Sequence, residues 1–137
     1  RTNIPSTPEL DPTQGFERCL RDFVTGVAAH FTDPEWRRIL PALMTLKQYL
    51  PEVDDLTDND RDAKIESLHT VLEQGIREGR LPADVDAHDV AMTLVGPLMM
   101  CSLLGHDPEA VSRVGEYTIE RFLASYRDTR ATEPAAD

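Results

Sequence analysis

The stretch VAMTLVGPLMMCSLLG, residues 90–105, decides the fold class of this 137-residue chain. Its apolar residues recur on every side of a helix rather than along one stripe. The preceding Asp86-Ala87-His88-Asp89 is a helix-capping pattern, because an aspartate at the N-cap accepts amides that the first turn leaves unpaired. A helix that is apolar all round must be covered on more than one side. The stretch therefore predicts a helical core and, as the simplest cover, a partner subunit.

Apolar residues at helical spacing mark four further segments, residues 11–31, 34–50, 58–78 and 108–126. Three of these begin at an Asp-Pro pair, at Asp11, Asp33 and Asp107, where the aspartate suits the N-cap and the proline suits the first helical position. The sequence contains no run of alternating β-branched residues typical of strands. The chain is therefore predicted to be all-α, an antiparallel helical bundle of about five helices.

Prolines and glycines predict where these helices bend or end. Pro41 lies inside the second segment, where it predicts a kink or break, and Pro51 ends that segment. Gly79 is placed to end the third segment in the left-handed conformation.

The acid-rich residues 51–62 are interpreted as a solvated loop and a first helical turn, where the helix dipole favours carboxylates. A calcium loop is the alternative, and the absence of a glycine from this stretch disfavours it.

The length is that of a single domain, and a hydrophobic content of 40% suffices for a packed core. We expect a flexible lead-in at residues 1–10, a helical domain at residues 11–126 and a flexible tail at residues 127–137. The first residue is Arg1 rather than methionine, so we expect a fragment, or a protein whose first part is missing.

The composition excludes several classes of partner. Lys and Arg number 14 against 25 Asp and Glu, and the net charge of −11 disfavours direct binding to nucleic acid or to an anionic membrane. No run approaches the roughly 20 apolar residues that a membrane helix needs, and no signal-peptide pattern occurs. Two cysteines are too few for a disulfide scaffold, so a cytoplasmic location is expected.

Patterns typical of catalysis or metal binding are weak. Glu66 and His69 have the Glu-x-x-His spacing of helical di-metal sites, but the second copy that such sites need is missing. No serine lies in a G-x-S-x-G turn. Cys19 and Cys101 lie among apolar neighbours, where a thiol usually packs as a small hydrophobe. We therefore expect no enzymatic activity, no metal and no cofactor, and a metal-dependent helical enzyme is the least favoured hypothesis.

Residues 71–81, VLEQGIREGRL, followed by Asp84-Val85-Asp86 and by Gly96-Pro97, resemble the C-terminal regulatory domain of TetR-family transcriptional regulators. In that family a long helix ends in a G-x-x-x-G-x-L turn, and a D-x-D connector leads into the first dimerisation helix. The order and spacing of these motifs agree over about residues 12–126. The resemblance implies a ligand-responsive transcriptional repressor, although the sequence does not distinguish repression from activation.

The resemblance also implies partners. This chain would bind a small apolar effector and form a homodimer, and a helix-turn-helix domain not contained in this sequence would read the operator DNA. An effector that prefers one arrangement of the dimer would change the spacing of the two DNA-binding domains. The alternative function is a stand-alone helical module that binds an apolar small molecule and has no role at DNA.

The helical stripes supply candidate residues for both roles. The effector-binding candidates are Phe16, Leu20, Phe23, Trp36, Ile39, Leu43, Leu72 and Met99. The dimer-interface candidates are Leu94, Pro97, Leu98, Cys101, Val111, Val114, Gly115, Thr118 and Phe122. Two alternatives stay open. For each residue of the first set, ordinary core packing is the favoured alternative. The last helix has a second apolar line, Ile119, Leu123 and Tyr126, which would face the partner if the first line faces the chain's own core.

Overall fold

The computed structural model describes residues 15–132, and the side chains of all of these except residues 53–61 and 127–132. Its helices are α1 (Phe16–Thr32), α2 (Pro34–Leu46), α3 (Pro51–Arg77), α4 (Ala87–Leu94), α5 (Gly96–Leu103) and α6 (Pro108–Thr132). No strand occurs in this part of the chain, so the predicted all-α class is confirmed. The predicted lead-in, the helix start at Asp11 and the end of the tail lie outside the described residues. None of the described helices is both long and apolar enough to span a membrane.

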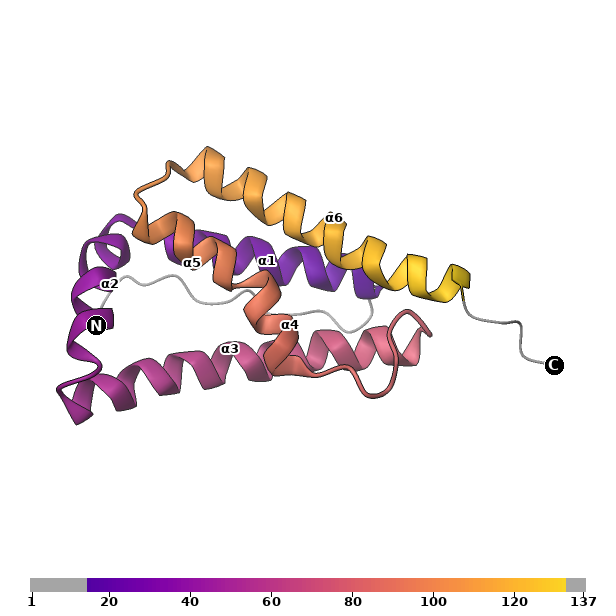
Figure 1. Ribbon diagram of the computed structural model, residues 1–137, viewed down its shortest axis with the longest axis horizontal. Coiled ribbons are helices and arrows are strands. Elements are labelled where there is room, and N and C mark those ends of the chain that lie inside the picture. The colour runs from indigo at the N-terminus through magenta and orange to yellow at the C-terminus, as the bar shows by residue number, and fades with distance from the viewer. Residues whose placement is uncertain (1–14, 133–137) are drawn as a thin grey trace.

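Helix α1 lies at the centre of the bundle. Figure 1 shows α1 between α3 and α6, both of which run in the direction opposite to α1. Helix α2 closes one end of the bundle between α1 and α3, and α4 and α5 lead from α3 back to α6 (Figure 1). The neighbouring long helices are therefore antiparallel, as the sequence predicts.

The inner face of α1 explains its central position. Phe16, Leu20, Phe23 and Val27 follow one another at helical spacing, and each is at most 1% exposed. Burial of one such side chain contributes about 1.5–3 kcal/mol. The surrounding helices complete this core with Leu68, Val71, Leu94, Leu98 and Val111. Packing around α1 therefore holds the other helices in place.

The predicted helix ends are confirmed at five positions. Asp33, Asp86 and Asp107 each accept a hydrogen bond from the backbone amide three residues on, at 2.7–3.0 Å. Gly79 has a φ of +72° just after α3, a left-handed conformation that glycine adopts without a steric penalty. Gly105 ends α5 in the same way, with a φ of +77°.

The apolar helix predicted for residues 86–105 is divided into α4 and α5 at Val95. Pro97 accounts for the division, because a proline inside a helix lacks an amide hydrogen and its ring crowds the preceding turn. Pro41 behaves differently, since α2 continues through it from Pro34 to Leu46. The five predicted helices are thus present, with the fourth interrupted.

Several helix boundaries differ from the prediction. Helix α1 begins at Phe16, with Gly15 as its extended N-cap rather than Asp11, and α2 ends at Leu46, before the predicted end at residue 50. The backbone is helical from Pro51, so the prediction of a loop before a helix starting at about residue 58 was wrong. Proline at the first helical position and acidic residues in the following turns both favour this early start. At the other end, α6 continues to Thr132, past the predicted end at Tyr126.

Candidate functional site

An apolar cavity of about 330 Å³ lies between α2, α3, α4 and α5, beside the C-terminal end of α1. The volume is at the lower end of the range for small-molecule sites, about 300–1,000 Å³. The wall consists mainly of apolar side chains and includes two lysines and one histidine. The lining residues are Phe31, Trp36, Leu40, Met44, Lys47, Lys64, Ile65, His88, Ala91, Met92, Val95, Gly96 and Met99.

The α2 side of the apolar cavity follows from the sequence pattern. Trp36, Leu40 and Met44 recur every four residues and so share one face of the helix. Asp33 sets the start of α2 by accepting the Trp36 amide at 3.0 Å. The Trp36 ring also packs against the ring of His30, with centroids 4.6 Å apart. The largest side chain of the wall is therefore held in a fixed position.

The opposite side of the cavity is formed where α4 gives way to α5. Ala91, Val95 and Met99 recur at four-residue spacing across the interruption, and Gly96 adds backbone without a side chain. A Cβ placed on Gly96 would have no heavy atom within 4 Å, which indicates open space beside it. The interrupted helix thus supplies one wall of the cavity.

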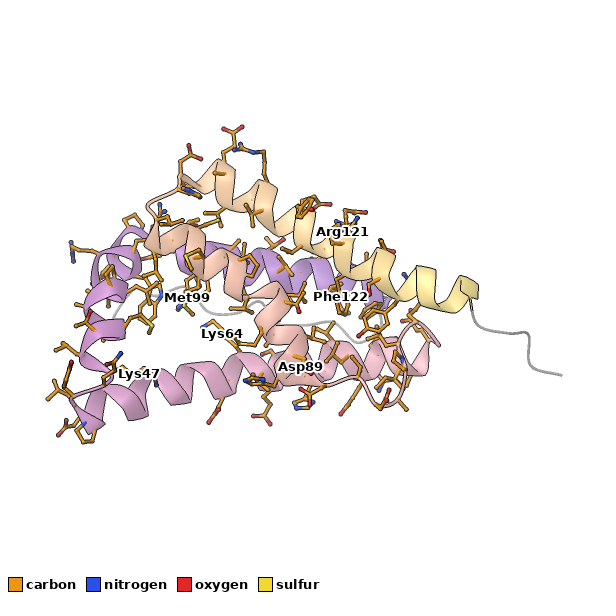
Figure 2. The ribbon with its side chains drawn as sticks, in the orientation of Figure 1. Lys47, Lys64, Asp89, Met99, Arg121 and Phe122 are labelled. Carbon is orange, nitrogen blue, oxygen red and sulfur yellow. The ribbon has the colours of Figure 1, made fainter. Side chains whose placement is uncertain are left out.

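The charged side chains of the described cavity wall are both cationic. Lys64 on α3 is only 9% exposed, and its Nζ lies 5.9 Å from the centroid of the Phe31 ring. Lys47 is the C-cap residue of α2. Figure 2 shows Lys47, Lys64 and Met99 around the space that α2, α3 and α5 enclose. His88 on α4 is exposed, and no carboxylate belongs to the described lining.

The structure brings two of the eight predicted effector-binding residues to this cavity, Trp36 and Met99. Ile39 and Leu43 are half-buried on α2 and pack against the core. The remaining four are almost completely buried in the core and do not line the cavity: Phe16, Leu20, Phe23 and Leu72. The core-packing alternative fits these four.

Several lining residues were missed, although some carried a signal. Met44 continues the stripe of Trp36 and Leu40, and Ile65 lies one turn before Leu68 on the inner face of α3. Lys64 carried no such signal, because a helical lysine is usually solvated. Only the packing of α3 against the neighbouring helices places its side chain in a cavity wall.

A second depression, of about 360 Å³, lies between α1 and α6. Much of its border consists of small or polar exposed side chains, including Thr25, Ala29, Ser112 and Glu116. Such a surface offers little apolar area to a ligand. The apolar cavity is therefore the better candidate for a small-molecule site.

Most of the predicted dimer residues lie inside a single chain. Leu94, Leu98 and Val111 are 0% exposed, which leaves no surface for a partner. Cys101, Thr118 and Phe122 are also buried, whereas Pro97 and Val114 are half-buried.

Gly115 allows a close approach within the chain. A Cβ at this position would lie 3.3 Å from Cγ1 of Val24 on α1 and 3.6 Å from Cδ2 of Leu98 on α5. The alternative line on α6 is covered as well, since Ile119 and Leu123 are each 3% exposed. Both apolar lines of α6 therefore face the core of their own chain.

Large apolar side chains stay exposed on α5 and α6, as they do at Met92 on α4 and at Tyr49 and Leu50 between α2 and α3. Met100, Leu103 and Leu104, at the end of α5, are 55%, 36% and 64% exposed and share one face by their spacing. Tyr117, on the adjacent helix α6, is 66% exposed. We call these four residues the α5–α6 surface. Exposed apolar residues on two adjacent helices suit a protein interface when they form one patch.

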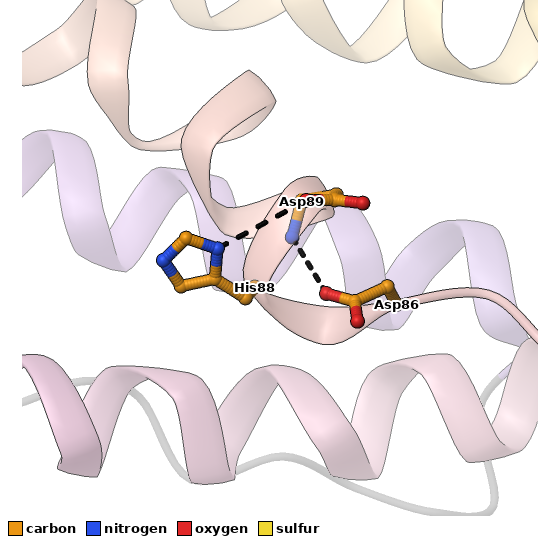
Figure 3. A group of neighbouring side chains, drawn as sticks. All are labelled: Asp86, His88 and Asp89. Atoms are coloured by element: carbon orange, nitrogen blue, oxygen red, sulfur yellow. Dashed lines mark hydrogen bonds and ion pairs between the residues drawn. The ribbon is translucent and has the colours of Figure 1, made fainter.

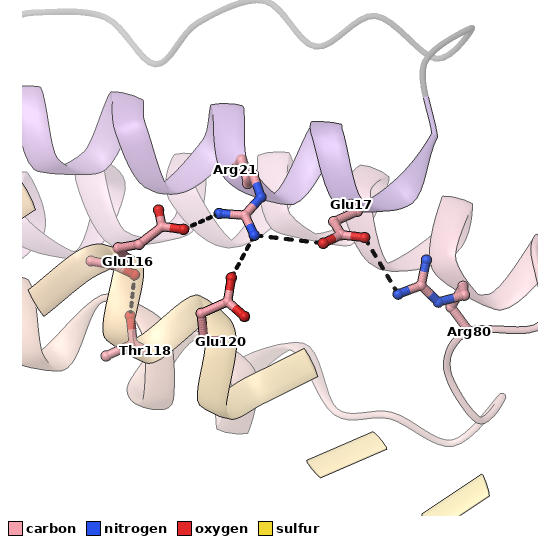
Figure 4. Close-up of polar contacts among 7 residues, drawn as sticks. Glu17, Arg21, Arg80, Glu116, Thr118 and Glu120 are labelled. Atoms are coloured by element: carbon pink, nitrogen blue, oxygen red, sulfur yellow. Dashed lines mark hydrogen bonds and ion pairs between the residues drawn. The ribbon is translucent and has the colours of Figure 1, made fainter. Parts of the chain in front are cut away.

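A polar network joins α6 to α1. Arg21 donates hydrogen bonds to the carboxylates of Glu120, at 2.7 Å, and Glu116. These two bonds, that of Glu120 first, raise the pKa of the Arg21 guanidinium above its ordinary value. Glu17 lies 3.5 Å from Arg21 and 3.7 Å from Arg80, which follows α3 (Figure 4). The network fixes the position of α6 on α1.

Three exposed polar side chains lie together at the start of α4. The possible metal-ligating atoms of Asp86, His88 and Asp89 all lie within 4.8 Å of one another. Figure 3 shows Asp86 accepting the Asp89 amide at 2.9 Å, and His88 Nδ1 lies 3.9 Å from the Asp89 carboxylate. Helix capping and the favourable helix dipole explain why both aspartates lie here. Their positions therefore require no metal.

Comparison with protein families supports the resemblance seen in the sequence. Residues 11–118 match the family described as tetracyclin repressor-like, C-terminal domain. The matched range includes α1 to α5 and the first part of α6, and so contains the whole apolar cavity and the α5–α6 surface. Comparisons with curated proteins and with solved structures found no match. The chain therefore belongs to the family of tetracyclin repressor-like C-terminal domains.

Proposed function

We propose that this chain is the effector-binding and homodimerisation part of a ligand-responsive transcriptional repressor of the cytoplasm. The family supports the proposal, since such domains are typically the ligand-binding and dimerisation parts of TetR regulators. The observation that carries it is the apolar cavity of about 330 Å³, with walls from several helices. A helix-turn-helix domain outside these 137 residues would bind the operator, because a net charge of −11 disfavours contact with DNA here.

Helix α5 couples the cavity to the surface of the molecule. Met99 lines the cavity, whereas the next residue, Met100, is 55% exposed. A ligand that fits only one position of α5 stabilises that position. It thereby also stabilises the matching arrangement of the exposed residues on the outer face of α5. In a dimer, the same shift would change the relative orientation of the subunits and of the DNA-binding domains. The free energy by which the ligand can favour one arrangement is no larger than the difference between its binding free energies for the two arrangements.

The homodimer of this proposal is formed through the α5–α6 surface. Met100, Leu104 and Tyr117 are largely exposed in one chain, whereas Leu94 and Leu98 are already covered. A twofold axis would pair the surface with its own copy, which is the commonest arrangement of soluble homo-oligomers.

Light scattering after gel filtration tests the dimer. We expect a mass near twice the 15.4 kDa of one chain. A mass near 15.4 kDa over a wide range of concentrations would contradict the proposal.

The coding sequence upstream of Arg1 provides a second test, because it is expected to encode a basic helix-turn-helix domain. An in-frame stop codon directly before Arg1 would contradict the regulator function.

The second candidate function is a stand-alone helical module that binds an apolar small molecule. One observation favours it: the inner residues Leu94 and Leu98 are 0% exposed without any partner, so a single chain covers that side of the apolar helix. This candidate predicts a monomer that binds ligand, whereas the repressor predicts a dimer that binds ligand.

A further inference from the structure

We propose that the ligand of the apolar cavity is an uncharged, mainly apolar molecule with a carbonyl oxygen, which accepts a hydrogen bond from Nε1 of Trp36. The inference rests on the proposed role of the cavity as the effector site and names the chemistry of its ligand. The cavity volume of about 330 Å³ corresponds to about eleven groups of the size of water, at roughly 30 Å³ each. A ketone with a single aromatic ring fits within this volume.

Trp36 has a hydrogen-bond donor that its own chain leaves unused. The residue lines the cavity and is only 8% exposed, and its Nε1 has no hydrogen-bond partner in the described part of the chain. An indole N–H can only donate, so it needs an acceptor. Buried donors are nearly always paired, because an unpaired one has lost its bonds to water without a replacement. An acceptor supplied by the ligand would pair this donor.

The charged side chains of the described wall favour an uncharged ligand, because they are already engaged. Lys47 and Lys64 both interact within the chain, and Nζ of Lys64 also lies 5.9 Å from the ring centroid of Phe31. A carboxylate or ammonium that entered the cavity would lose its hydration without gaining a counter-charge of its own, at a large cost in free energy. A carbonyl group loses far less hydration, and one donor is enough to replace it.

Flexible methionines allow the ligand to reach Nε1 of Trp36. That atom is shielded from solvent, so a neighbouring side chain must shift before an acceptor can contact it. The indole ring itself packs against His30, with centroids 4.6 Å apart, whereas three of the four methionines of the chain line the cavity: Met44, Met92 and Met99 (Figure 2 labels Met99). Methionine is unbranched and readjusts easily, and its sulfur makes favourable contacts with aromatic rings. The wall therefore suits a ligand with an aryl body.

The single tryptophan of the chain provides the measurement, because a ¹H–¹⁵N spectrum then contains one indole N–H peak. This peak moves downfield when the proton is hydrogen-bonded to an oxygen. The probes are acetophenone, α-methylstyrene and benzoate, which share a phenyl ring and carry a carbonyl group, an apolar group of the same shape and a carboxylate. Each is titrated into the unaltered chain. We expect acetophenone to move the indole peak further downfield than α-methylstyrene does, and benzoate to bind at least about tenfold more weakly than acetophenone.

The outcomes separate this inference from the proposed function. If acetophenone and α-methylstyrene both bound and moved the indole peak equally, the hydrogen bond to Trp36 would be overturned and the cavity would remain an effector site. Tighter binding of benzoate than of acetophenone would overturn the uncharged ligand and would likewise leave the effector site. The absence of binding by all three probes would overturn both this inference and the effector site.

Two variants locate the donor, with affinities measured from the methyl resonances of Met92 and Met99 in the cavity wall. Trp36→Phe keeps an aromatic ring and removes the N–H, so we expect the affinity of acetophenone relative to that of α-methylstyrene to fall about tenfold. Met44→Leu alters the same wall without removing a donor and should preserve this ratio. An unchanged ratio in Trp36→Phe would show that Trp36 is not the donor. Circular dichroism checks that both variants are folded, and the indole measurement in the unaltered chain needs no variant.

Discussion

The carboxylate of Glu78, just after α3, accepts a hydrogen bond from the backbone amide of Phe16, the first residue of α1, at 2.9 Å. The N-cap of α1 is Gly15, which has no side chain to accept that amide. Glu78 therefore caps α1 across 62 residues of sequence. Gln74 donates to the same carboxylate oxygen and helps to orient it. This contact joins the start of the central helix to the turn that resembles the family motif.

Glu78→Ala is expected to lower the free energy of unfolding by about 1 kcal/mol, the usual effect of losing a helix N-cap. Glu78→Gln keeps an acceptor oxygen and should cost less. Urea denaturation measures both effects. Glu73→Ala, at an exposed position of the same helix, is the control and should change stability by less than about 0.5 kcal/mol. Equal losses in Glu78→Ala and Glu73→Ala would contradict the capping role.

Gly75→Ala is expected to destabilise the fold despite the better helix propensity of alanine. A Cβ at Gly75 would lie 2.8 Å from Cδ1 of Phe16, a ring that is only 1% exposed, and 2.7 Å from Cδ1 of Leu81. Overpacking of this kind costs about 1–3 kcal/mol, against a gain of about 1 kcal/mol in propensity. Thermal unfolding should therefore show a lower melting temperature. Gly96→Ala, where a Cβ meets nothing within 4 Å, is the matched control and should be neutral or stabilising.

Arg21→Gln is expected to lower stability by about 1 kcal/mol at low salt, because Glu17, Glu116 and Glu120 then repel one another without a cation between them. The loss should shrink in high salt, which screens exposed charges. Arg18→Gln is the control on the same helix, since it makes the same charge change but breaks only the pair with Asp22 at 3.3 Å. Chemical denaturation at two salt concentrations compares the variants. A loss at Arg21 that does not depend on salt would rule out an electrostatic origin.

Leu104→Glu is expected to convert the proposed dimer to a monomer while leaving the helices folded, because Leu104 is 64% exposed in one chain. Phe122→Glu should behave differently, since Phe122 is 6% exposed and a carboxylate there would enter the core. Light scattering and circular dichroism distinguish the two effects. If Phe122→Glu gave a folded monomer and Leu104→Glu a dimer, the interface would lie on the face that contains Phe122.

Tyr126 is expected to make stability fall at alkaline pH. Burial raises the pKa of its phenol above the ordinary value of 10.0, and the carboxylates of Asp84 and Asp89 raise it further. The unfolded chain therefore loses this proton first, so the contribution of Tyr126 to stability is complete below about pH 10 and is lost as pH rises through the raised pKa. Tyr126→Phe should weaken the alkaline decline. Unfolding free energies of both proteins at about pH 9 and about pH 11 measure the effect, and their difference at pH 7 corrects for lost packing. An unchanged alkaline decline in the variant would contradict this role.

The helix pattern was predictable because its determinants are local. The Asp33 and Asp107 caps, the left-handed Gly79 and the α1 stripe all depend on residues within one or two turns. The start of α3 was missed because acidic residues suit both a loop and a first helical turn. The interruption at Val95 was missed although Pro97 marks it, because apolar residues continue on both sides of the proline.

The site was less predictable because an apolar stripe does not indicate what lies opposite it. Phe23 and Trp36 occur in similar patterns, yet Phe23 is in the core and Trp36 lines the cavity. The same ambiguity affected Leu98, which is 0% exposed, and Met100, which is 55% exposed. Lys64 carried no indication in the sequence that it would enter a cavity wall.

By itself, the sequence determined the all-α class, most helix ends and the family, since these depend on short-range backbone chemistry and on the spacing of motifs such as Gly75 to Gly79. Only the tertiary structure decided which apolar residues form the core, which line the cavity and which stay exposed. The physical reason is that burial is a property of packed helices. A side chain such as Lys64 or Met99 acquires its environment from α1, α2 and α5 coming together, and no local pattern contains that information.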